Sequence, residues 1–575
     1  MQTFQENYKK QLHTLANQMR SLPMPKLTEE LFALFETTGN RLQYEEVYFR
    51  RRKFLAVFGI AAYIFKRRED VEKLSSVLLD ICEEECWALP AHVNRAADEN
   101  WRNTVDLFAS ETAQSLAEII SLVNDALPGE NKLPEGICQR VKKEIEERVF
   151  LPFFSTTPKY GSWECSDHNW NAVCAGSIGS ACIYLMQDKE YLDACLKRLC
   201  HSLTYYLDGF REDGACMEGI GYFTYGMTYF IGFAEQLLRY SDGKINLFAN
   251  EKLRKIAEFQ QKTYFGGGQT VSFSDGEKQA KFRMGLTCYL ARQYDTVWVP
   301  EERLACDFES DSCYRFSGLM RDYLWTKETK KPEPGVGGGK NTVRHDILPD
   351  AQWSICESKN GVGFAIKGGD NGEPHNHNDI GSFLYLVNEE QLITDLGAGE
   401  YTKEYFSTGR YQILCNSSLG HSVPVISGEL QKEGKQYRAS EFTSDGRGFT
   451  RVEFAGAYGS PAVKKLVREA RFSLEDGSLQ IKDEFALSEH AEGVTEQLVT
   501  QGQVEFSPEG IRIKGVNSAC LIQFPEKIQN LRVVEKQHSN HVGQLEIVRL
   551  IQWEIEEKDK ECTAETRWNI VPYTD

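Results

Sequence analysis

The hydrophobic pattern of this chain changes its period once, and that change limits the folds open to it. Up to about residue 325, apolar residues recur every three to four positions, as in AQSLAEIISLVNDAL. Beyond that point they alternate with polar residues, as in ARFSLEDGSLQIKDEF, where Asp476-Gly477 indicates a hairpin turn. The first pattern is typical of amphipathic helices and the second of half-buried strands. The sequence therefore predicts an all-helical part followed by an antiparallel β-sandwich.

Consecutive helices joined by short Gly, Pro or Asp breaks make up the first part. Each helix must bury its apolar stripe against its neighbours, so we expect a layered or toroidal helical body. The segments with helical spacing are 49–66, 69–82, 111–126, 134–149, 171–187, 189–207, 222–240, 249–263 and 280–294.

The segment KETKKPEPGVGGGKN, from Lys327 to Asn341, separates the two patterns. It combines charge, two prolines and four glycines without apolar periodicity, which is typical of a linker. The expected division is a helical domain over 1–326, a linker over 327–341 and a β-sandwich over 342–575.

Composition places the chain among folded proteins and argues against two partner classes. It has 575 residues, of which 41% are hydrophobic and 26% charged, so global disorder is excluded. The net charge of −18 disfavours a nucleic-acid partner, because phosphate binding depends on Lys and Arg. The longest apolar run, Phe54 to Phe65, falls short of the roughly 20 residues of a membrane-spanning helix. We expect neither a nucleic-acid nor a membrane partner.

The N-terminus and the cysteines predict a cytoplasmic location. MQTFQENYKKQLHTLANQM has no apolar signal core, and the sixteen cysteines include no CxxC pair. Scattered cysteines in apolar surroundings fit free thiols in a reducing compartment. If a signal had been removed, the location would instead be periplasmic or secreted.

The densest polar cluster of the β-rich part is PHNHND, which contains His375 and His377. In a strand these two imidazoles would point to the same face. Asp395 ends the strand QLITD, and His421 precedes the strand SVPVIS. Histidines and a carboxylate at the ends of neighbouring strands are suitable zinc ligands. The alternative is that Asp395 caps a turn and His421 is an ordinary surface imidazole.

The helical part has its own polar cluster, DHNWN, at the start of a helix that is rich in small residues. Asp213-Gly214 and the segment EGIGYFTYG, which begins at Glu218, follow further along the chain. Each piece alone fits a cap or a turn, because Asn and Asp favour helix N-termini. Their combination indicates a functional site.

Four segments together resemble the heparinase II/III-like polysaccharide lyases. They are HNWNAVCAGSIGSA, DGACMEGIGYFTYG, PHNHNDIGSFLYLVNEEQLITDLGAGEY and NSSLGHSVPVISGELQ. The resemblance is strong over about 150–430, and the order of helices and strands extends it over the whole chain. It implies an incomplete (α/α) toroid packed on an antiparallel β-sandwich, with the active cleft between them.

The resemblance also implies a reaction and its residues. Such lyases cleave uronic-acid-containing glycans by β-elimination, leaving a 4,5-unsaturated uronide. Asn169 resembles the residue that neutralises the uronate carboxylate, and Tyr222 and His375 resemble the catalytic tyrosine and histidine. The implied substrate is an acidic oligosaccharide or polysaccharide, with heparin or heparan sulfate favoured and an alginate-type oligosaccharide as an alternative.

The implied cofactor is one divalent metal ion, with zinc favoured, in a mainly structural role and without an organic cofactor. Its ligands by resemblance are His377, Asp395 and His421. An exo-acting enzyme that works on imported oligosaccharides is one hypothesis. A homo-oligomer is compatible with the sequence.

Further residues are candidates for catalysis or substrate binding. His168 and Asn171 flank Asn169 and could contact the same carboxylate. Tyr225 lies one helical turn from Tyr222 and competes with it for the catalytic role. Arg410 could bind a substrate anion through its guanidinium group, together with Tyr411. Glu400 and Tyr401 are weaker candidates for the same cleft.

Three rival functions remain open at this point. A zinc hydrolase would use His375, His377 and Asp379 to hold a catalytic metal. A glycoside hydrolase would use Asp213 and Glu218 as acid and base, although this leaves the histidines unexplained. A glycan-binding protein without catalysis is the third, since fold alone never establishes activity.

Overall fold

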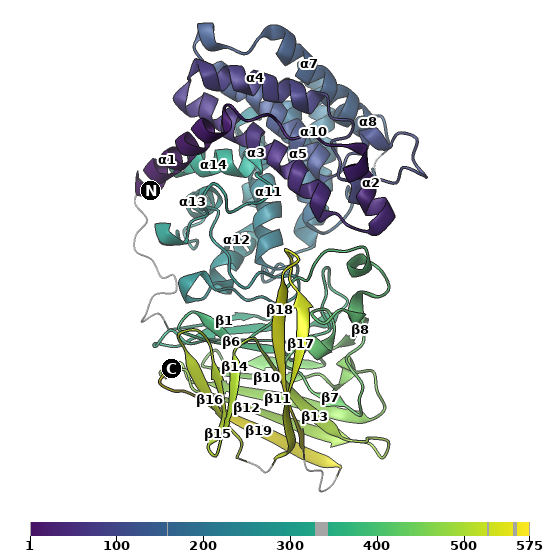
Figure 1. Cartoon of the computed structure of the whole chain (residues 1–575), viewed down its shortest axis with the longest axis vertical. Helices are drawn as coiled ribbons and strands as arrows, with labels where there is room; N and C mark the ends of the chain where they lie inside the picture. The colour runs from purple at the N-terminus through teal and green to yellow at the C-terminus, as the bar shows by residue number, and fades with distance from the viewer. Residues whose placement is uncertain (1, 158, 328–342, 526–527, 556–559, 574–575) are drawn as a thin grey trace. The chain divides into compact units, whose positions relative to one another are not determined.

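The computed structural model describes residues 2–157, 159–327, 343–525, 528–555 and 560–573. Internal contacts divide the described chain into two compact units (Figure 1). The helical unit contains the chain up to Phe210, Tyr222–Arg254, and the chain from Lys281 through the last helix. The sheet unit contains Arg211–Gly221, Lys255–Ala280 and the chain from the first strand onward. The predicted linker over 327–341 lies, apart from Lys327, outside the described residues.

Each of the nine predicted helical segments corresponds to a helix, and the period of three to four residues is therefore confirmed. Short π-helical turns over Ile119–Val123 and Glu146–Phe150 extend α5 and α7. The helices are α1 (Gln2–Met19), α2 (Glu29–Thr38), α3 (Leu42–Phe65), α4 (Arg68–Cys82), α5 (Leu107–Glu118), α6 (Asn124–Ala126), α7 (Glu135–Ile145), α8 (Leu151–Phe154), α9 (Asn169–Leu185), α10 (Lys189–Asp208), α11 (Ile220–Tyr240), α12 (Glu251–Thr263), α13 (Met284–Gln293) and α14 (Phe316–Lys327).

Small residues let the buried helix α9 lie close to α11. A Cβ atom added to Gly176 would come within 2.8 Å of the backbone oxygen of Tyr229 in α11. Gly179 faces the ring of Phe233 in the same way. Helix α9 also packs against α5 and α10. The middle turns of α9 and α11 are therefore held together by close packing, and the predicted site residues of this unit lie near the starts of the same two helices.

The described residues of the sheet unit form four antiparallel sheets, as the period of two predicted. Their strand orders are β1-β2-β3-β5-β6, β14-β15-β16-β19-β12-β11-β10-β9, β17-β18-β13-β7 and β4-β8. The strands are β1 (Arg344–Leu348), β2 (Trp353–Glu357), β3 (Gly363–Lys367), β4 (Asp370–Asn371), β5 (Phe383–Val387), β6 (Glu390–Ile393), β7 (Val425–Ile426), β8 (Gly434–Arg438), β9 (Glu441–Ser444), β10 (Phe449–Glu453), β11 (Val463–Phe472), β12 (Leu479–Leu487), β13 (Val494–Thr500), β14 (Gln503–Ser507), β15 (Gly510–Lys514), β16 (Ala519–Gln523), β17 (Ile528–Ser539), β18 (Leu545–Ile555) and β19 (Glu561–Ile570).

Alternating burial shows how the strands build the core of this unit. Along β12, every second residue from Leu479 to Leu487 is buried. The predicted turn at Asp476-Gly477 connects β11 to β12, and Gly477 adopts a φ of 77°, which favours glycine. The inward residues include Phe364, which stacks on Phe472 with ring centroids 5.6 Å apart. One face of the large sheet thus packs into a shared core.

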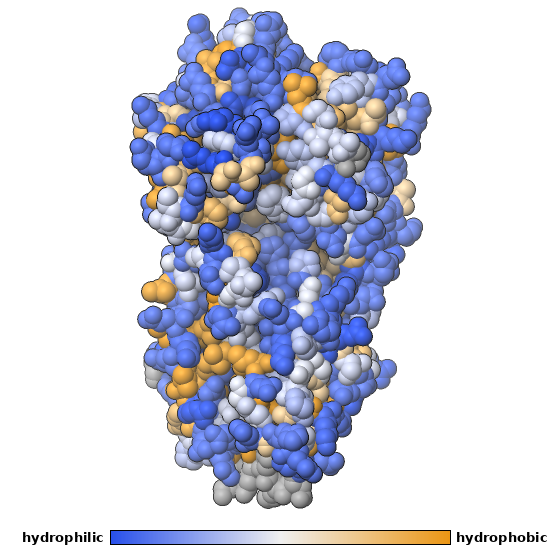
Figure 2. All heavy atoms as spheres, turned by 90° about the vertical axis from the view of Figure 1, so that its right-hand side faces the viewer, coloured by the Kyte–Doolittle hydropathy of each residue, from blue (hydrophilic) through white to orange (hydrophobic). Residues whose placement is uncertain are grey.

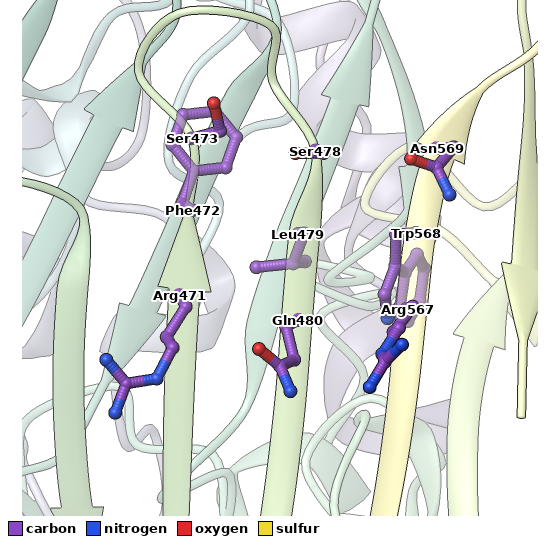
Figure 3. Close-up of a pocket in the computed structure, with 9 residues that line it drawn as sticks. All are labelled: Arg471, Phe472, Ser473, Ser478, Leu479, Gln480, Arg567, Trp568 and Asn569. Carbon is purple, nitrogen blue, oxygen red and sulfur yellow. The ribbon is translucent and has the colours of Figure 1, made fainter. Parts of the chain in front are cut away.

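The opposite face of this sheet has a shallow depression with a cavity volume of about 350 Å³ (Figure 3). Arg471, Gln480 and Arg567 lie side by side there on neighbouring strands. Both arginines are paired with glutamates of their own strands, Arg471 with Glu469 and Arg567 with Glu565. The charges of the depression are therefore largely balanced, and it contains none of the predicted site residues.

Three further facts concern the surface, the helices and the thiols. The face drawn in Figure 2 is mainly hydrophilic, with scattered apolar patches. Among the described residues, no helix combines the length and apolar character needed to span a membrane. All sixteen cysteines are free thiols, as predicted.

Candidate functional site

The PHNHND segment leads from β4 into β5 and places its two histidines in different surroundings. The side chain of His375 is 21% exposed, whereas that of His377 is fully buried. His375 has a left-handed backbone with a φ of 55°, which is uncommon outside glycine. Such a conformation persists only where surrounding contacts hold it. One of those contacts is Arg410, whose Nη2 donates to the backbone oxygen of Asn376 at 3.1 Å.

A buried carboxylate that the sequence analysis missed connects these histidines. Asp275 accepts a hydrogen bond from His375 Nδ1 at 2.6 Å and from His377 Nε2 at 3.0 Å. Tyr401 and Tyr405 also donate their hydroxyls to it. Asp275 stands 100 positions before His375, in a loop after α12, and its Asp-Gly pair resembles an ordinary turn. No local pattern in the sequence marks it.

These contacts shift the pKa values of both partners. Burial alone would raise the pKa of Asp275, but the hydrogen bonds from His375 and His377 hold that pKa well below its ordinary value. Burial would lower the pKa of His375, but the bond and charge of Asp275 outweigh it and the pKa is raised. The second ring nitrogen of His375 lies 3.8 Å from a carboxylate oxygen of Glu218.

The predicted metal ligands come together in the interior of the sheet unit. One ligand atom each from His377, Asp395 and His421 lie within 4.8 Å of one another, and all three side chains are fully buried. Asp395 lies two residues after the end of β6, and His421 lies in the loop before β7. The convergence of three predicted residues from three loops fits a cation site.

The hydrogen bonds around the cluster show which atoms are available to a cation. The backbone oxygen of Cys415 can only accept, so His421 must donate to it from Nε2, at 2.7 Å. Nδ1 of His421 then faces a carboxylate oxygen of Asp395 at 3.0 Å. Nδ1 of His377 is buried without a hydrogen-bond partner among the described residues. Two imidazole nitrogens and a carboxylate oxygen therefore fit the coordination preferences of zinc.

Asp379, which the hydrolase alternative needs as a ligand, binds elsewhere. It accepts from Lys367 Nζ at 2.5 Å, and both side chains are almost fully buried. It is not part of the metal-capable cluster found among the described residues. His375 is likewise held by Asp275 and not by the cluster. The arrangement of a catalytic metal on His375, His377 and Asp379 is therefore absent from the described structure.

The remaining candidates of the sheet unit are held by protein groups. Arg410 donates from Nη1 to the backbone oxygen of Tyr405 at 3.2 Å, besides its bonds to Asn376. Tyr411 accepts a long bond from the Asn376 amide at 3.5 Å. Tyr401 lies parallel to the His375 ring, with centroids 6.3 Å apart. These residues surround His375 and restrict its position.

In the helical unit, the DHNWN segment starts α9. His168 is the N-cap, and Asn169, which is only 2% exposed, is the first helical residue. Asn171 is fully buried, and its amide donates to the backbone oxygen of Glu164 at 2.8 Å and to the hydroxyl of Ser202 at 3.0 Å. Those bonds give Asn171 a structural role at the helix start.

The two candidate tyrosines of α11 differ in their surroundings. Both are half-buried. The Tyr225 hydroxyl donates to the buried carboxylate of Glu111, and the Arg315 guanidinium lies 3.9 Å from the centre of its ring. Burial raises the pKa of Glu111 to about 7, although Arg315 opposes this. The Tyr225 hydroxyl is thus bound within the unit, whereas Tyr222 is the tyrosine nearest the start of α11.

The acids of the glycoside-hydrolase alternative both belong to the sheet unit. Asp213 accepts backbone N–H bonds from Asp350 at 2.7 Å and Ala351 at 3.0 Å. It therefore organises a turn. A carboxylate oxygen of Glu218 lies 3.8 Å from Nε2 of His375.

Comparison with known proteins supports the fold. No family model and no curated protein sequence matches this chain. A solved heparinase III structure superposes with a TM-score of 0.63 at 14% identity, covering 98% of this chain and 84% of the other. The heparan sulfate lyase HepC from Pedobacter heparinus gives 0.62 at 12% identity, covering 99% and 89%. A chondroitin AC lyase from Streptomyces coelicolor A3, solved with chondroitin sulphate, gives 0.53 at 11%, covering 97% and 78%.

These likenesses confirm the fold class that the sequence predicted. The chain has the architecture of the heparinase III structures, a helical toroid followed by an antiparallel β-sandwich. The likeness extends over nearly the whole chain, so it is not limited to the four motif segments. At identities of 12–14% it establishes the fold, and the chemistry has to be argued from the residues.

Proposed function

We propose that the protein is a polysaccharide or oligosaccharide lyase that cleaves an acidic, uronate-containing glycan by β-elimination. Glycosaminoglycans of the heparan sulfate type are the favoured substrate class. The fold likeness to heparan sulfate and chondroitin lyases supports this class. An alginate-type oligosaccharide is the second candidate within the same chemistry.

β-Elimination requires three functions at one sugar ring. The proton at C5 becomes acidic enough to remove when the neighbouring carboxylate is neutralised by hydrogen-bond donors. A base then takes that proton, the C4–O4 bond breaks, and an acid protonates the departing oxygen. The electrons of the C5–H bond form the C4–C5 double bond, so no water is consumed.

The residues are assigned to these functions as follows. Asn169 neutralises the uronate carboxylate through its amide, and Tyr222 and His375 supply the base and the acid. His375 reacts through Nε2, because Nδ1 is bound to Asp275. The proposal requires Asn169 and Tyr222 of the helical unit to act on the same uronate as His375.

A divalent cation, zinc by the nature of its ligands, is proposed at His377, Asp395 and His421. When bound, it would neutralise the buried charges and tie three loops of the sheet unit together. The residues around it hold the PHNHND segment and thereby the position of His375. The groups proposed to carry out catalysis are side chains of the protein and not the cation.

The geometry of His375 carries the proposal. It is a partly exposed imidazole with one nitrogen held by a buried carboxylate, which is the arrangement of a positioned acid or base. The zinc-hydrolase alternative has less support, because Asp379 is bound to Lys367.

The experiment is incubation of the protein with oligosaccharides of heparan sulfate, heparin, chondroitin, hyaluronan and alginate, followed by ultraviolet absorbance. The unsaturated uronide absorbs, whereas a product of hydrolysis does not. Tyr222→Phe is the matched control, and we expect it to fold normally without forming product. Cleavage without ultraviolet absorbance would contradict the proposal and favour a hydrolase.

Removing and restoring zinc distinguishes a structural metal ion from a catalytic one. The lyase is expected to lose thermal stability on chelation, with activity declining only as the protein unfolds. An immediate loss of turnover at unchanged stability would indicate a catalytic metal.

The exo-type hypothesis is tested on long polymers, where an early fall in viscosity before small products appear would contradict it.

A further inference from the structure

One buried carboxylate contacts both histidines of the PHNHND segment. The side chain of Asp275 is fully buried. Its Oδ2 accepts from His375 Nδ1 at 2.6 Å, and its Oδ1 accepts from His377 Nε2 at 3.0 Å. The two imidazoles are thus bound to the same group through different ring nitrogens.

The carboxylate has no capacity left for another role. Tyr401 donates to Oδ2 at 2.8 Å, and Tyr405 donates to Oδ1. An ionised carboxylate offers about four lone-pair sites, so these four donors occupy them all. Arg410 adds a positive charge 3.6 Å from Oδ1. Asp275 therefore acts only as an acceptor.

The acceptor role fixes where each histidine carries its proton. His375 must hold a proton on Nδ1 to donate it, which leaves Nε2 as the nitrogen that faces Glu218, 3.8 Å from a carboxylate oxygen. His377 must hold a proton on Nε2, which leaves the lone pair of Nδ1 directed elsewhere. That Nδ1 is buried and has no hydrogen-bond partner among the described residues. Nδ1 is thus the nitrogen of His377 that is available to a cation.

We propose that Asp275 is a positioning residue that sets opposite tautomers in two neighbouring histidines. It directs Nε2 of His375 to the substrate and Nδ1 of His377 to the metal ion. The first half of this inference rests on the proposed lyase function. The second half concerns the cation site alone and stands without it.

The backbone on both sides of the Asp275–His375 hydrogen bond has left-handed residues, as expected where contacts hold two loops in place. Ser274, directly before Asp275, has a φ of 59°, and His375 has a φ of 55°. Left-handed residues other than glycine are strained and persist where the surrounding contacts hold them. The loop that carries Asp275 and the loop that carries His375 each contain such a residue.

Asp275→Asn tests the inference, because an amide keeps one acceptor oxygen and replaces the other by a donor. In either orientation one histidine faces an N–H group and loses its bond or changes tautomer. We expect kcat to fall by about 10³- to 10⁴-fold with a smaller change in KM, as for the carboxylate of a catalytic triad. We also expect zinc affinity, measured by competition with a chromophoric chelator, to fall by about 10- to 100-fold.

Two variants serve as controls. Tyr405→Phe removes one donor but leaves both histidine bonds, so kcat and zinc affinity should each stay within about tenfold of the wild type. His421→Ala removes a metal ligand without touching the Asp275–His375 bond, so zinc affinity should fall far more than kcat of the folded protein. Wild-type kcat in Asp275→Asn would refute the assignment for His375. Wild-type zinc affinity would refute it for His377.

Nitrogen NMR of the histidine-labelled wild type gives a measurement that needs neither activity nor a folded Asp275 variant. His375→Gln and His377→Gln identify the two signals by their loss. We expect the Nδ1–H form for His375 and the Nε2–H form for His377 in the zinc-bound protein. The same tautomer in both would overturn the inference, whereas absence of lyase activity with these tautomers would overturn only the proposed function.

Discussion

Glu111 provides a quantitative test of the electrostatics inside the helical unit. Burial raises the pKa of this carboxyl from 4.5 to about 7, even though Arg315 and the Tyr225 hydroxyl oppose the shift. The folded protein therefore keeps a proton that the unfolded chain releases between pH 4.5 and 7. Stability must fall as pH rises through this window, because the native state binds more protons there. The difference, 7 − 4.5, corresponds to about 3 kcal/mol.

Glu111→Gln removes this dependence, because the amide stays neutral at every pH. Thermal unfolding of both proteins by calorimetry from pH 5 to pH 8 measures the effect. We expect the melting temperature of the variant to rise relative to the wild type across this range by about 5 °C. Tyr225→Phe is the matched control, because it keeps the carboxyl and removes only a group that opposes the raised pKa, so the fall of stability with rising pH should persist. A constant difference between Glu111→Gln and the wild type would refute the raised pKa.

Three further predictions concern the two proposed sites and the buried ion pair. Tyr222→Phe should abolish the unsaturated product while Tyr225→Phe retains it, since the Tyr225 hydroxyl is already bound to a carboxylate; equal loss in both would contradict this. His421→Ala should lower the zinc content by metal analysis and the melting temperature, and unchanged zinc content would remove His421 from the ligand set. Lys367→Met should cost about 3–5 kcal/mol in urea unfolding, because Asp379 is left buried without its partner. Adding Asp379→Leu should recover most of that loss, and a double variant as unstable as the single one would show that the pair is not the cause.

Much of the fold could be predicted from the sequence, because hydrophobic period reports local structure. The alternation along LQIKDEFAL corresponds to the alternating burial of β12, and the Asp476-Gly477 turn lies where it was expected. The metal-capable set was predicted in a different way, from the resemblance of the motif segments. That resemblance assigned His377, Asp395 and His421 as ligands, and the three side chains lie together in the structure.

The remaining parts of the site depend on contacts between distant segments, which leave no periodic signal. Asp275 is in a loop a hundred positions from His375, and only the folded chain shows that it binds both histidines. Lys367 is the last residue of the otherwise apolar strand β3, where a single charge gives no indication of its pairing with Asp379. Glu111 lies in a segment whose pattern predicts a helix and nothing more. Its bond to Tyr225 follows from the packing of the folded unit.

The mass balance of the reaction distinguishes cleavage of the glycosidic bond by elimination from cleavage by hydrolysis. A uronate-containing oligosaccharide of defined length is digested, and the products are analysed by mass spectrometry together with their ultraviolet absorbance. We expect the masses of the two products to add up to the mass of the substrate and one product to absorb. Products whose masses add up to the substrate plus one water, without absorbance, would contradict the proposed elimination.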